Sequence, residues 1–319
     1  MGRRVFLGVD TSCYTTSLAV VDQSGTLLQE LRKPLPVAAG EVGLRQSDGV
    51  FHHVRNLPQL IQSLEIGVCE VQAVGVSDRP RPVSGSYMPV FLAGVAVAQA
   101  LATSSAAPLY RFSHQEGHIA AGLGGRPVQH PFLVLHISGG TSELLRVQPA
   151  AAGFAIDVLG GSADLSAGQM VDRVGVALGL PFPAGPDLER LARGAQGAIR
   201  LPSAAAGLSF SFSGPCSAAL RLVEAGETPA EIAFAVFRVI ANSLEKVLRR
   251  AGEAERLDRA LLVGGVMNNQ LVRDRLLQRL GPRFRLDFAA AGLSSDNAAG
   301  IAWLARERYL QERLSVDER

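Results

Sequence analysis

The apolar positions of this chain fall into short runs separated by polar turns, and the same order of runs occurs twice. The first set lies at residues 5–9, 17–21 and 26–31. The second set lies at residues 132–137, 142–147 and 154–159. Runs of this length between tight polar turns predict antiparallel meanders. The repetition is one of pattern and not of residues, and it predicts two related halves.

Helical spacing predicts helices between and after these meanders. They are expected at residues 91–102, 169–178 and 231–250. The last is the clearest, because Pro229 suits the first helical position and Thr228 with Glu231 has the spacing of a capping box. No low-complexity linker interrupts the chain. We therefore expect two interleaved lobes, one formed by residues 1–113 with 294–319 and the other by residues 114–293.

Composition excludes several classes of protein. The 319 residues are 47% hydrophobic and 19% charged, which is enough for a substantial core. A formal charge of +2 does not by itself indicate a nucleic-acid partner. No lysine follows a glycine-rich loop, which argues against a P-loop nucleotidase. Three widely spaced cysteines form neither a zinc motif nor a disulfide framework. No signal peptide or membrane span is expected, so the prediction is a cytoplasmic protein.

Two histidines four residues apart provide the first candidate chemistry. In a helix, His114 and His118 lie on one face and can hold one divalent ion if a third ligand comes from elsewhere. A zinc protease needs Glu directly after the first of these histidines, but Gln115 stands there. We therefore do not expect protease activity. A second pair, His52 and His53, is expected to lie on a helix face and not to bind a second metal.

Small polar or glycine residues follow three predicted strands. These segments are residues 10–12, 138–141 and 264–265. Main-chain N–H groups approach phosphate closely where no side chain intervenes. Three such loops, two of them opening the repeated meanders, resemble the nucleotide cleft of the α/β actin, Hsp70 and hexokinase-like (ASKHA) fold, with mixed sheets flanked by helices. Asp10 is expected near phosphate, or alternatively as the cap of its turn.

Ordered motifs then resemble those of one family, the TsaD-type N(6)-threonylcarbamoyladenosine synthases, formerly called O-sialoglycoprotein endopeptidases. The matching segments cover most of the chain and keep the order of the family. They are residues 114–118, 138–140, 168–173, 179–186, 210–214, 264–273 and 296–299. The last segment, Asp296-Asn297-Ala298-Ala299, is similar to the one that supplies the final metal ligand of the family.

The resemblance implies a specific reaction and a specific set of residues. Members transfer a threonylcarbamoyl group from threonylcarbamoyl-adenylate to the adenosine beside the anticodon of tRNAs that read codons beginning with A. The implied metal, iron or zinc, has as its ligands His114, His118 and Asp296. The implied adenylate or nucleotide site consists of Ser12, Ile137, Ser138, Gly139, Gly140, Thr141, Asp172, Gly185, Gly264, Gly265 and Asn269. No residue is assigned as a catalytic acid, base or nucleophile, since the attacking group belongs to the tRNA.

The resemblance also implies partners, and the sequence departs from the family in the phosphate loops. A smaller TsaB-type related subunit or a second copy is expected, with the helix near Phe51 as a possible face. Tyr14 and Thr15 replace two acidic residues of the family, and Thr141 replaces a histidine. Two alternatives therefore stay open. One is a nucleotide-binding regulatory or scaffold paralogue without turnover, and the other is a small-molecule kinase of the same fold.

Overall fold

The computed structural model describes residues 2–36, 44–67, 69–150, 153–290 and 292–317. The chain forms two compact units of similar size. Unit 1 consists of Met1–Gln129, Pro149–Ala155 and Ser295–Arg319. Unit 2 consists of His130–Gln148 and Ile156–Ser294. Each unit contains one five-stranded sheet.

The sheet of unit 1 has the strand order β3-β2-β1-β4-β5. Its strands are β1 (Arg4–Thr11), β2 (Thr15–Asp22), β3 (Leu27–Pro34), β4 (Glu70–Arg79) and β5 (Leu109–Ser113). The first three form the predicted antiparallel meander, and β4 and β5 add in parallel to β1. The sheet is therefore mixed, and its parallel part requires helical crossovers.

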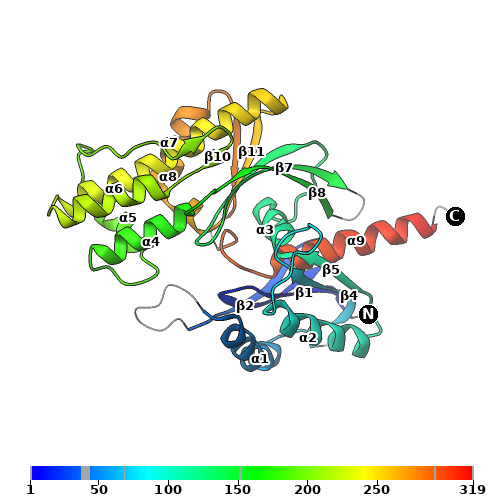
Figure 1. The fold of residues 1–319 in the computed structure, drawn as a ribbon. Coiled ribbons are helices and arrows are strands. Elements are labelled where there is room, and N and C mark those ends of the chain that lie inside the picture. The colour runs from blue at the N-terminus through cyan, green and yellow to red at the C-terminus, as the bar shows by residue number, and fades with distance from the viewer. Residues whose placement is uncertain (1, 37–43, 68, 151–152, 291, 318–319) are drawn as a thin grey trace. The chain divides into compact units, whose positions relative to one another are not determined.

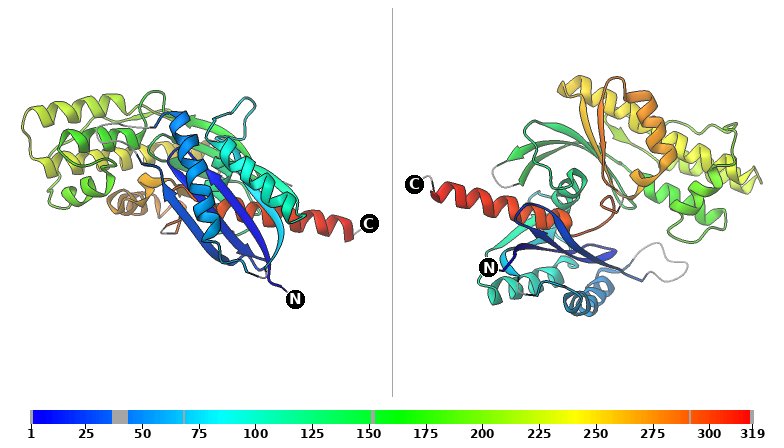
Figure 2. Two further views of the ribbon diagram at one scale, coloured as in Figure 1. Left: turned by 90° about the horizontal axis from the view of Figure 1, so that it is seen from below. Right: turned by 180° about the vertical axis from the view of Figure 1, so that it is seen from behind.

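Helices cover both faces of this sheet. They are α1 (Gln46–Gln62), α2 (Phe91–Ser104), α3 (His114–Leu123) and α9 (Ala299–Asp317). In Figure 1, α1 and α2 lie on one face, whereas α3 and α9 lie on the other (Figures 1 and 2). Helix α9 lies directly on the strands, because a Cβ at Gly8 would be 2.3 Å from the carbonyl oxygen of Ala298. Glycine is thus required at this contact between strand and helix.

The sheet of unit 2 repeats the arrangement, with the order β12-β11-β6-β7-β8. Its strands are β6 (Phe132–Ile137), β7 (Ser142–Ala150), β8 (Gly153–Gly161), β11 (Arg259–Val263) and β12 (Arg285–Phe288). Strand β6 pairs antiparallel with β7 and parallel with β11, as β1 does with β2 and β4. This equivalence confirms the predicted repeat of the strand pattern. A small second sheet consists of β9 (Ala205–Ala206) and β10 (Ser209–Phe210).

The helices of unit 2 surround a core that contains one long helix. They are α4 (Ala167–Ala177), α5 (Gly185–Ala192), α6 (Ser213–Glu224), α7 (Pro229–Glu255) and α8 (Gln270–Leu280), with a short 3₁₀ turn η1 (Gly265–Asn268). Buried residues of α7 at helical spacing, such as Ile240 and Leu244, belong to one apolar cluster with Leu133 and Leu135 of β6. Burial of this face stabilises α7 along most of its length.

The start of α7 differs from the sequence prediction. Pro229 does occupy the first turn, but the side chain of Thr228 forms no capping hydrogen bond. The carboxylate of Glu231 instead accepts hydrogen bonds from the main-chain N–H groups of residues 196–198. The predicted capping box is therefore wrong, because a preceding loop offers three donors to the same carboxylate.

The two compact units also differ from the expected lobes at their boundaries. Residues 114–129 and 149–155 group with unit 1. The reason is the contact between α3 and α9, where a Cβ at Gly300 would lie 1.8 Å from the carbonyl oxygen of Gly117. Among the helices that the structure describes, none is long and apolar enough to cross a membrane.

Candidate metal centre and anion-binding loops

Three side chains of unit 1 converge as the sequence predicts. His114 and His118 lie in the first two turns of α3, and Asp296 precedes α9. The Nε2 atom of His114 lies 3.4 Å from Oδ1 of Asp296, and that of His118 lies 3.2 Å from the same oxygen. One potential ligand atom of each residue lies within 4.8 Å of the others. This spacing allows a single ion to contact all three.

The helix geometry around the cluster explains why these residues meet. Ser113 caps α3, and Glu116 completes a capping box by accepting hydrogen bonds from the N–H and hydroxyl groups of Ser113. The carboxylate of Glu116 is therefore committed to the end of the helix. The close crossing at Gly117 and Gly300 brings the start of α3 against α9. The loop that carries Asp296 ends at this crossing.

Two residues at the end of β1 orient this cluster. Oδ1 of Asp10 lies 2.8 Å from Nδ1 of His114, which leaves Nε2 directed toward Asp296. The hydroxyl of Ser12 donates a 2.6 Å hydrogen bond to Oδ2 of Asp296. In metal sites, a carboxylate typically accepts a hydrogen bond from the histidine nitrogen that does not bind the metal. This contact fixes the tautomer and the orientation of the ring. The prediction of Asp10 as a turn cap is wrong, because its carboxylate binds this imidazole.

Electrostatics in the cluster favour charged groups. Burial raises the pKa of Asp296, but hydrogen bonds and positive charge from His114 and His118 outweigh it and hold this pKa well below its usual range. Burial lowers the pKa of His114, but Asp10 and then Asp296 outweigh it and raise this pKa well above its usual range. Two carboxylates thus attract positive charge to one buried place. Protons on imidazole or a divalent cation satisfy that demand.

His53 supports the same loop from the opposite side. Its side chain is fully buried in α1, with Nε2 2.8 Å from the carbonyl oxygen of Ser12 and Nδ1 2.8 Å from the hydroxyl of Thr16. Asn56 donates a further hydrogen bond to Thr16. The sequence predicted only that His52 and His53 lie on a helix face. His53, and not its neighbour His52, faces the strand, because His53 shares one face of the helix with the buried residues Leu57 and Leu60.

The residues present fit a divalent cation by their own chemistry. Two imidazole nitrogens and one carboxylate are a set used by metal sites that leave one coordination position open for water or substrate. Asp10 is fully buried, and its Oδ2 atom has no hydrogen-bond partner among the described residues. A buried carboxylate oxygen without a donor is stabilised by nearby positive charge. A cation held by His114, His118 and Asp296 provides it.

In unit 2, two loops follow neighbouring parallel strands. Ser138, at the end of β6, closes a turn with Thr141. The N–H of Ser138 donates to the carbonyl oxygen of Thr141, and the hydroxyl oxygen of Ser138 accepts from the N–H of Thr141. Apart from chain neighbours, no atom of the described residues lies within 4 Å of a Cβ built at Gly139, Gly140 or Gly265, so the main chain is open at these positions. Open main-chain N–H groups at the carboxyl ends of parallel strands suit an anion.

Packing behind these loops is tight. Gly264 has a φ of 100°, and a Cβ there would lie 2.3 Å from the carbonyl oxygen of Ile137. A Cβ at Gly168, in the first turn of α4, would lie 2.4 Å from the carbonyl oxygen of Ser138. Ser166 caps α4 and donates its hydroxyl to the carbonyl oxygen of Gly139 at 2.7 Å. The glycine loop therefore rests on the N-terminus of a helix.

Of the remaining predicted nucleotide residues of unit 2, Gly185 and Asn269 lie at the starts of helices, and Asp172 lies within α4. Oδ1 of Asp172 accepts a 2.9 Å hydrogen bond from the N–H of Ala184, next to Gly185 at the start of α5. Burial raises the pKa of Asp172, and this hydrogen bond opposes the rise. Asn269 caps α8 by accepting from the N–H of Val272, while its buried Nδ2 has no partner among the described residues. Free donor capacity of this kind suits a polar ligand.

The predicted site residues thus form two groups. The metal set lies in unit 1 together with Ser12, whose hydroxyl contacts Asp296 instead of remaining free. The other predicted nucleotide residues lie in unit 2. Sequence reasoning missed the contacts of Asp10 and His53 with this loop and its neighbours. The sequence showed only that Asp10 follows a strand and that His53 has a helical phase. It did not show their partners, His114 and Ser12, because these lie far away along the chain.

Comparison with known proteins follows the same order of motifs. Residues 50–303 match the model of the family described as TsaD, tRNA N6-adenosine threonylcarbamoyltransferase. A protein of that description from Aromatoleum aromaticum is 33% identical over 314 residues, covering 93% of this chain and 89% of its own length. Another from Sulfurihydrogenibium sp. (strain YO3AOP1) is 30% identical and covers 98% and 93%.

A longer relative and two solved structures complete the comparison. A probable bifunctional tRNA threonylcarbamoyladenosine biosynthesis protein of Methanothermobacter thermautotrophicus is 30% identical over 95% of this chain, which spans 55% of that protein. Component A of the Acidaminococcus fermentans (R)-2-hydroxyglutaryl-CoA dehydratase has a TM-score of 0.60 at 14% identity, covering 96% and 99% of the two chains. A Streptomyces griseus ROK family glucokinase has a TM-score of 0.53 at 13% identity, covering 94% and 98%. These structures share the ASKHA fold.

Proposed function

Because the chain belongs to the TsaD family, we propose that it transfers a threonylcarbamoyl group from threonylcarbamoyl-adenylate to an adenosine of tRNA. The observation that carries this proposal is the convergence of His114, His118 and Asp296 in unit 1. The open glycine main chain of unit 2 supports it independently, since an adenylate brings a phosphate that needs N–H donors.

The reaction balances without a nucleophile from the protein. The N6 amine of adenosine attacks the carbamoyl carbon, and a new C–N bond forms. The bond from that carbon to the phosphate oxygen breaks, AMP leaves, and the amine loses one proton. His114, His118 and Asp296 would hold the cation, which would supply Lewis acidity. In this proposal Asp10 and Ser12 hold the ligand set in place, since each contacts one of its members.

Unit 2 contributes adenylate binding in this proposal. Main-chain groups of Ile137, Ser138, Gly139 and Gly140 hold the phosphate, with Gly264 and Gly265 alongside. Asp172 and Asn269 bind ribose hydroxyls, and Gly185 leaves room for the sugar. Support comes from Oδ1 of Asp172 at the start of α5 and from the unpartnered Nδ2 of Asn269. The hydroxyl of Thr141 donates a hydrogen bond to the phosphate, but unlike a histidine it cannot take up and release a proton near neutral pH.

The test is reconstitution of the transfer. Purified protein is incubated with threonylcarbamoyl-adenylate, an unmodified tRNA transcript and either Fe²⁺ or Zn²⁺, and the digested nucleosides are analysed by mass spectrometry. We expect modified adenosine in amounts that fall at least 100-fold in the Asp296→Asn variant. Parallel reactions include a smaller TsaB-type related subunit, which the family implies. Phe51 and Val54 of α1 expose apolar side chains that suit such a partner or a second copy.

One observation favours a second candidate, a nucleotide-binding regulatory paralogue. The family's two acids in the first loop are Tyr14 and Thr15 here, and Thr141 replaces its histidine. Such a protein binds adenylate tightly but yields no modified adenosine with any metal or partner. Isothermal titration with AMP, run beside the transfer assay on the same sample, separates the two functions.

A further inference from the structure

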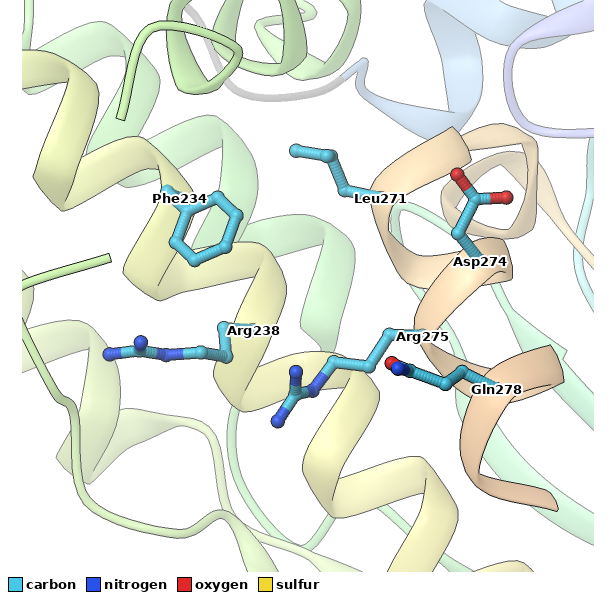
Figure 3. A pocket seen from close by; sticks show the side chains of 6 residues that line it. All are labelled: Phe234, Arg238, Leu271, Asp274, Arg275 and Gln278. Carbon is cyan, nitrogen blue, oxygen red and sulfur yellow. The ribbon is translucent and has the colours of Figure 1, made fainter. Parts of the chain in front are cut away.

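A cavity of about 510 Å³ lies in unit 2 beside α7. Its charged lining residues are Arg200, Arg238, Lys246 and Arg275. No carboxylate lines it among the residues that the structure describes. A smaller cavity of about 290 Å³ lies between α7 and α8 (Figure 3), and Arg238 and Arg275 line both cavities. The larger cavity, with its four positive side chains, is called the groove below.

The wall of the groove is fixed to α7. The guanidinium of Arg238 donates to the carbonyl oxygens of Gly197 and Ile199, the former at 2.8 Å. Glu231 accepts from the N–H groups of the same loop, and its carboxylate is thereby occupied. Further along, the N–H of Ala204 donates to the buried hydroxyl of Ser243. The groove is therefore a built feature and not a loose surface loop.

The positive charges in the groove are not held in ion pairs, although the negative charge of Glu245 also acts on Arg275. None of the four cations forms an ion pair with a carboxylate in the described part of the chain. Their contacts are neutral, for Arg275 donates to Oδ1 of Asn242 at 2.6 Å and Lys246 donates to the hydroxyl of Ser203 at 3.2 Å. Burial, followed by the neighbouring charges of Arg279 and Arg238, lowers the pKa of Arg275. Mutual repulsion of this kind is relieved by a bound anion.

The spacing of the charges favours a polyanion over a single small anion. Arg238 and Lys246 lie eight positions apart on α7, which at 1.5 Å per residue corresponds to about 12 Å. Cations spread over this length of helix can contact successive phosphates along an RNA strand. Guanidinium and ammonium groups with nearby hydroxyl and amide donors are the groups that hold nucleic-acid phosphates. One acidic residue, Asp274, lines the smaller cavity but not the groove.

We propose that the groove lined by Arg200, Arg238, Lys246 and Arg275 binds the phosphodiester backbone of the tRNA. The identity of the RNA rests on the proposed function. The arginines of segment 273–285 differ in their surroundings. Arg275 lines the groove, whereas Arg279 pairs with Glu245 and Arg273 donates to main-chain carbonyl groups.

The decisive variant removes two charges that do not hold the fold. Arg200 is exposed, and Lys246 contacts only the hydroxyl of Ser203, so the Arg200→Ala, Lys246→Ala double variant leaves the wall intact. Affinity for a fluorescent tRNA transcript is measured at several salt concentrations. We expect the Kd to rise on the order of 10-fold at 0.1 M salt. The slope of log Kd against log salt falls by about 1.4–1.8, or about 0.7–0.9 per lost contact.

Two controls separate charge in the groove from general effects. The Arg4→Ala, Arg313→Ala double variant removes two exposed charges of unit 1 and is expected to keep both affinity and slope. The Lys246→Arg variant retains the charge and is expected to bind as the original protein does. Equal tRNA affinity and slope in the groove variant and the original protein overturn the proposal, as does an original protein that binds no tRNA.

A further arm distinguishes small anions from RNA. If inorganic phosphate or AMP loses affinity in the groove variant while tRNA binding is unchanged, the groove takes a small ligand and the RNA proposal is overturned. Failure of the proposed function gives a different result. In that case the protein binds tRNA through the groove, with the expected salt dependence, but forms no modified adenosine.

Discussion

The ends of β1 and β6 occupy equivalent places in two sheets of the same order, yet they present different atoms. At the end of β1, Asp10 and Ser12 contribute carboxylate and hydroxyl groups that contact a histidine and an aspartate. At the end of β6, Gly139 and Gly140 present bare main chain. The same fold thus provides one site that depends on side-chain identity and another that depends on backbone conformation. Substitutions at the two places should fail in different ways.

The largest effect is expected from loss of a metal ligand in unit 1. The His118→Ala variant should lose more than about 100-fold in affinity for Fe²⁺ or Zn²⁺, which exceeds the loss typical of residues that only support a ligand. Metal content by elemental analysis and titration of the metal-free protein measure it. Asp172→Asn, in unit 2, is the matched control with unchanged metal content. Stoichiometric metal in the His118→Ala variant would remove the basis of the centre.

In unit 2 the comparison is sharpened by two adjacent glycines. Gly264→Ala places a Cβ 2.3 Å from a carbonyl oxygen at a φ of 100°, so we expect a loss of about 2–4 kcal/mol in the free energy of unfolding. Gly265→Ala meets no atom within 4 Å and should change stability by less than about 0.5 kcal/mol. Urea unfolding measures both.

The same pair tests the open main chain. Gly265→Ala is expected to weaken AMP binding although its fold is unchanged, because the added methyl group occupies the space that a phosphate would use. Equal AMP affinity in this variant and in the original protein would argue against an anion at this loop.

A supporting residue of the metal centre should have an intermediate effect. Asp10→Asn keeps the shape of the side chain but removes the charge that orients His114, and we expect metal affinity to fall about 10–100-fold. Titration of the metal-free variant measures the change, with Asp78→Asn, a carboxylate of the same unit outside the cluster, as the control. Unchanged affinity would mean that His114 needs no such support.

The smallest effect concerns a carboxylate in each unit that serves structure alone. Hydrogen bonds from Ser24, Arg3 and Thr26 outweigh burial and lower the pKa of Asp22 from 3.8 to about 2. Its contribution is therefore complete above about pH 4 and is lost as the pH falls toward 2. We expect Asp22→Asn to lower the free energy of unfolding by about 1–2 kcal/mol at pH 7 and much less at pH 2.5.

The counterpart in unit 2 is Asp164, which calibrates that measurement. Hydrogen bonds from Ser211 and Ser213 outweigh burial and lower its pKa to about 2 as well. Its side chain is more exposed, so solvent screening should leave an effect below about 1 kcal/mol at pH 7. Urea unfolding at both pH values compares the two variants. A pH-independent loss at either position would point to packing in place of charge.

The sequence predicted the features that depend on periodicity and residue type. Two meanders, the long helix α7 and the triad of His114, His118 and Asp296 followed from apolar spacing and from motif order. The contacts of Asp10 and His53 did not, because each depends on a partner more than thirty positions away. The predicted capping role of Glu231 was wrong for a similar reason, because N–H groups of a distant loop compete with the helix end for its carboxylate. Local propensity does not report such competition.

The crossing of α3 and α9 at Gly117 and Gly300 also limits how far the metal centre can yield. At this crossing a Cβ on Gly300 would lie 1.8 Å from the carbonyl oxygen of Gly117, so the two main chains are in close contact there, and the side chain of Ile301 packs against Gly117 beside it. The distance between the two histidines and the opposing aspartate is therefore set by backbone contact. The two helices therefore cannot readily shift to accommodate a cation whose radius does not suit this spacing. In the proposed metal centre, Gly117 and Gly300 would thus restrict the size of the ion together with the three ligand residues.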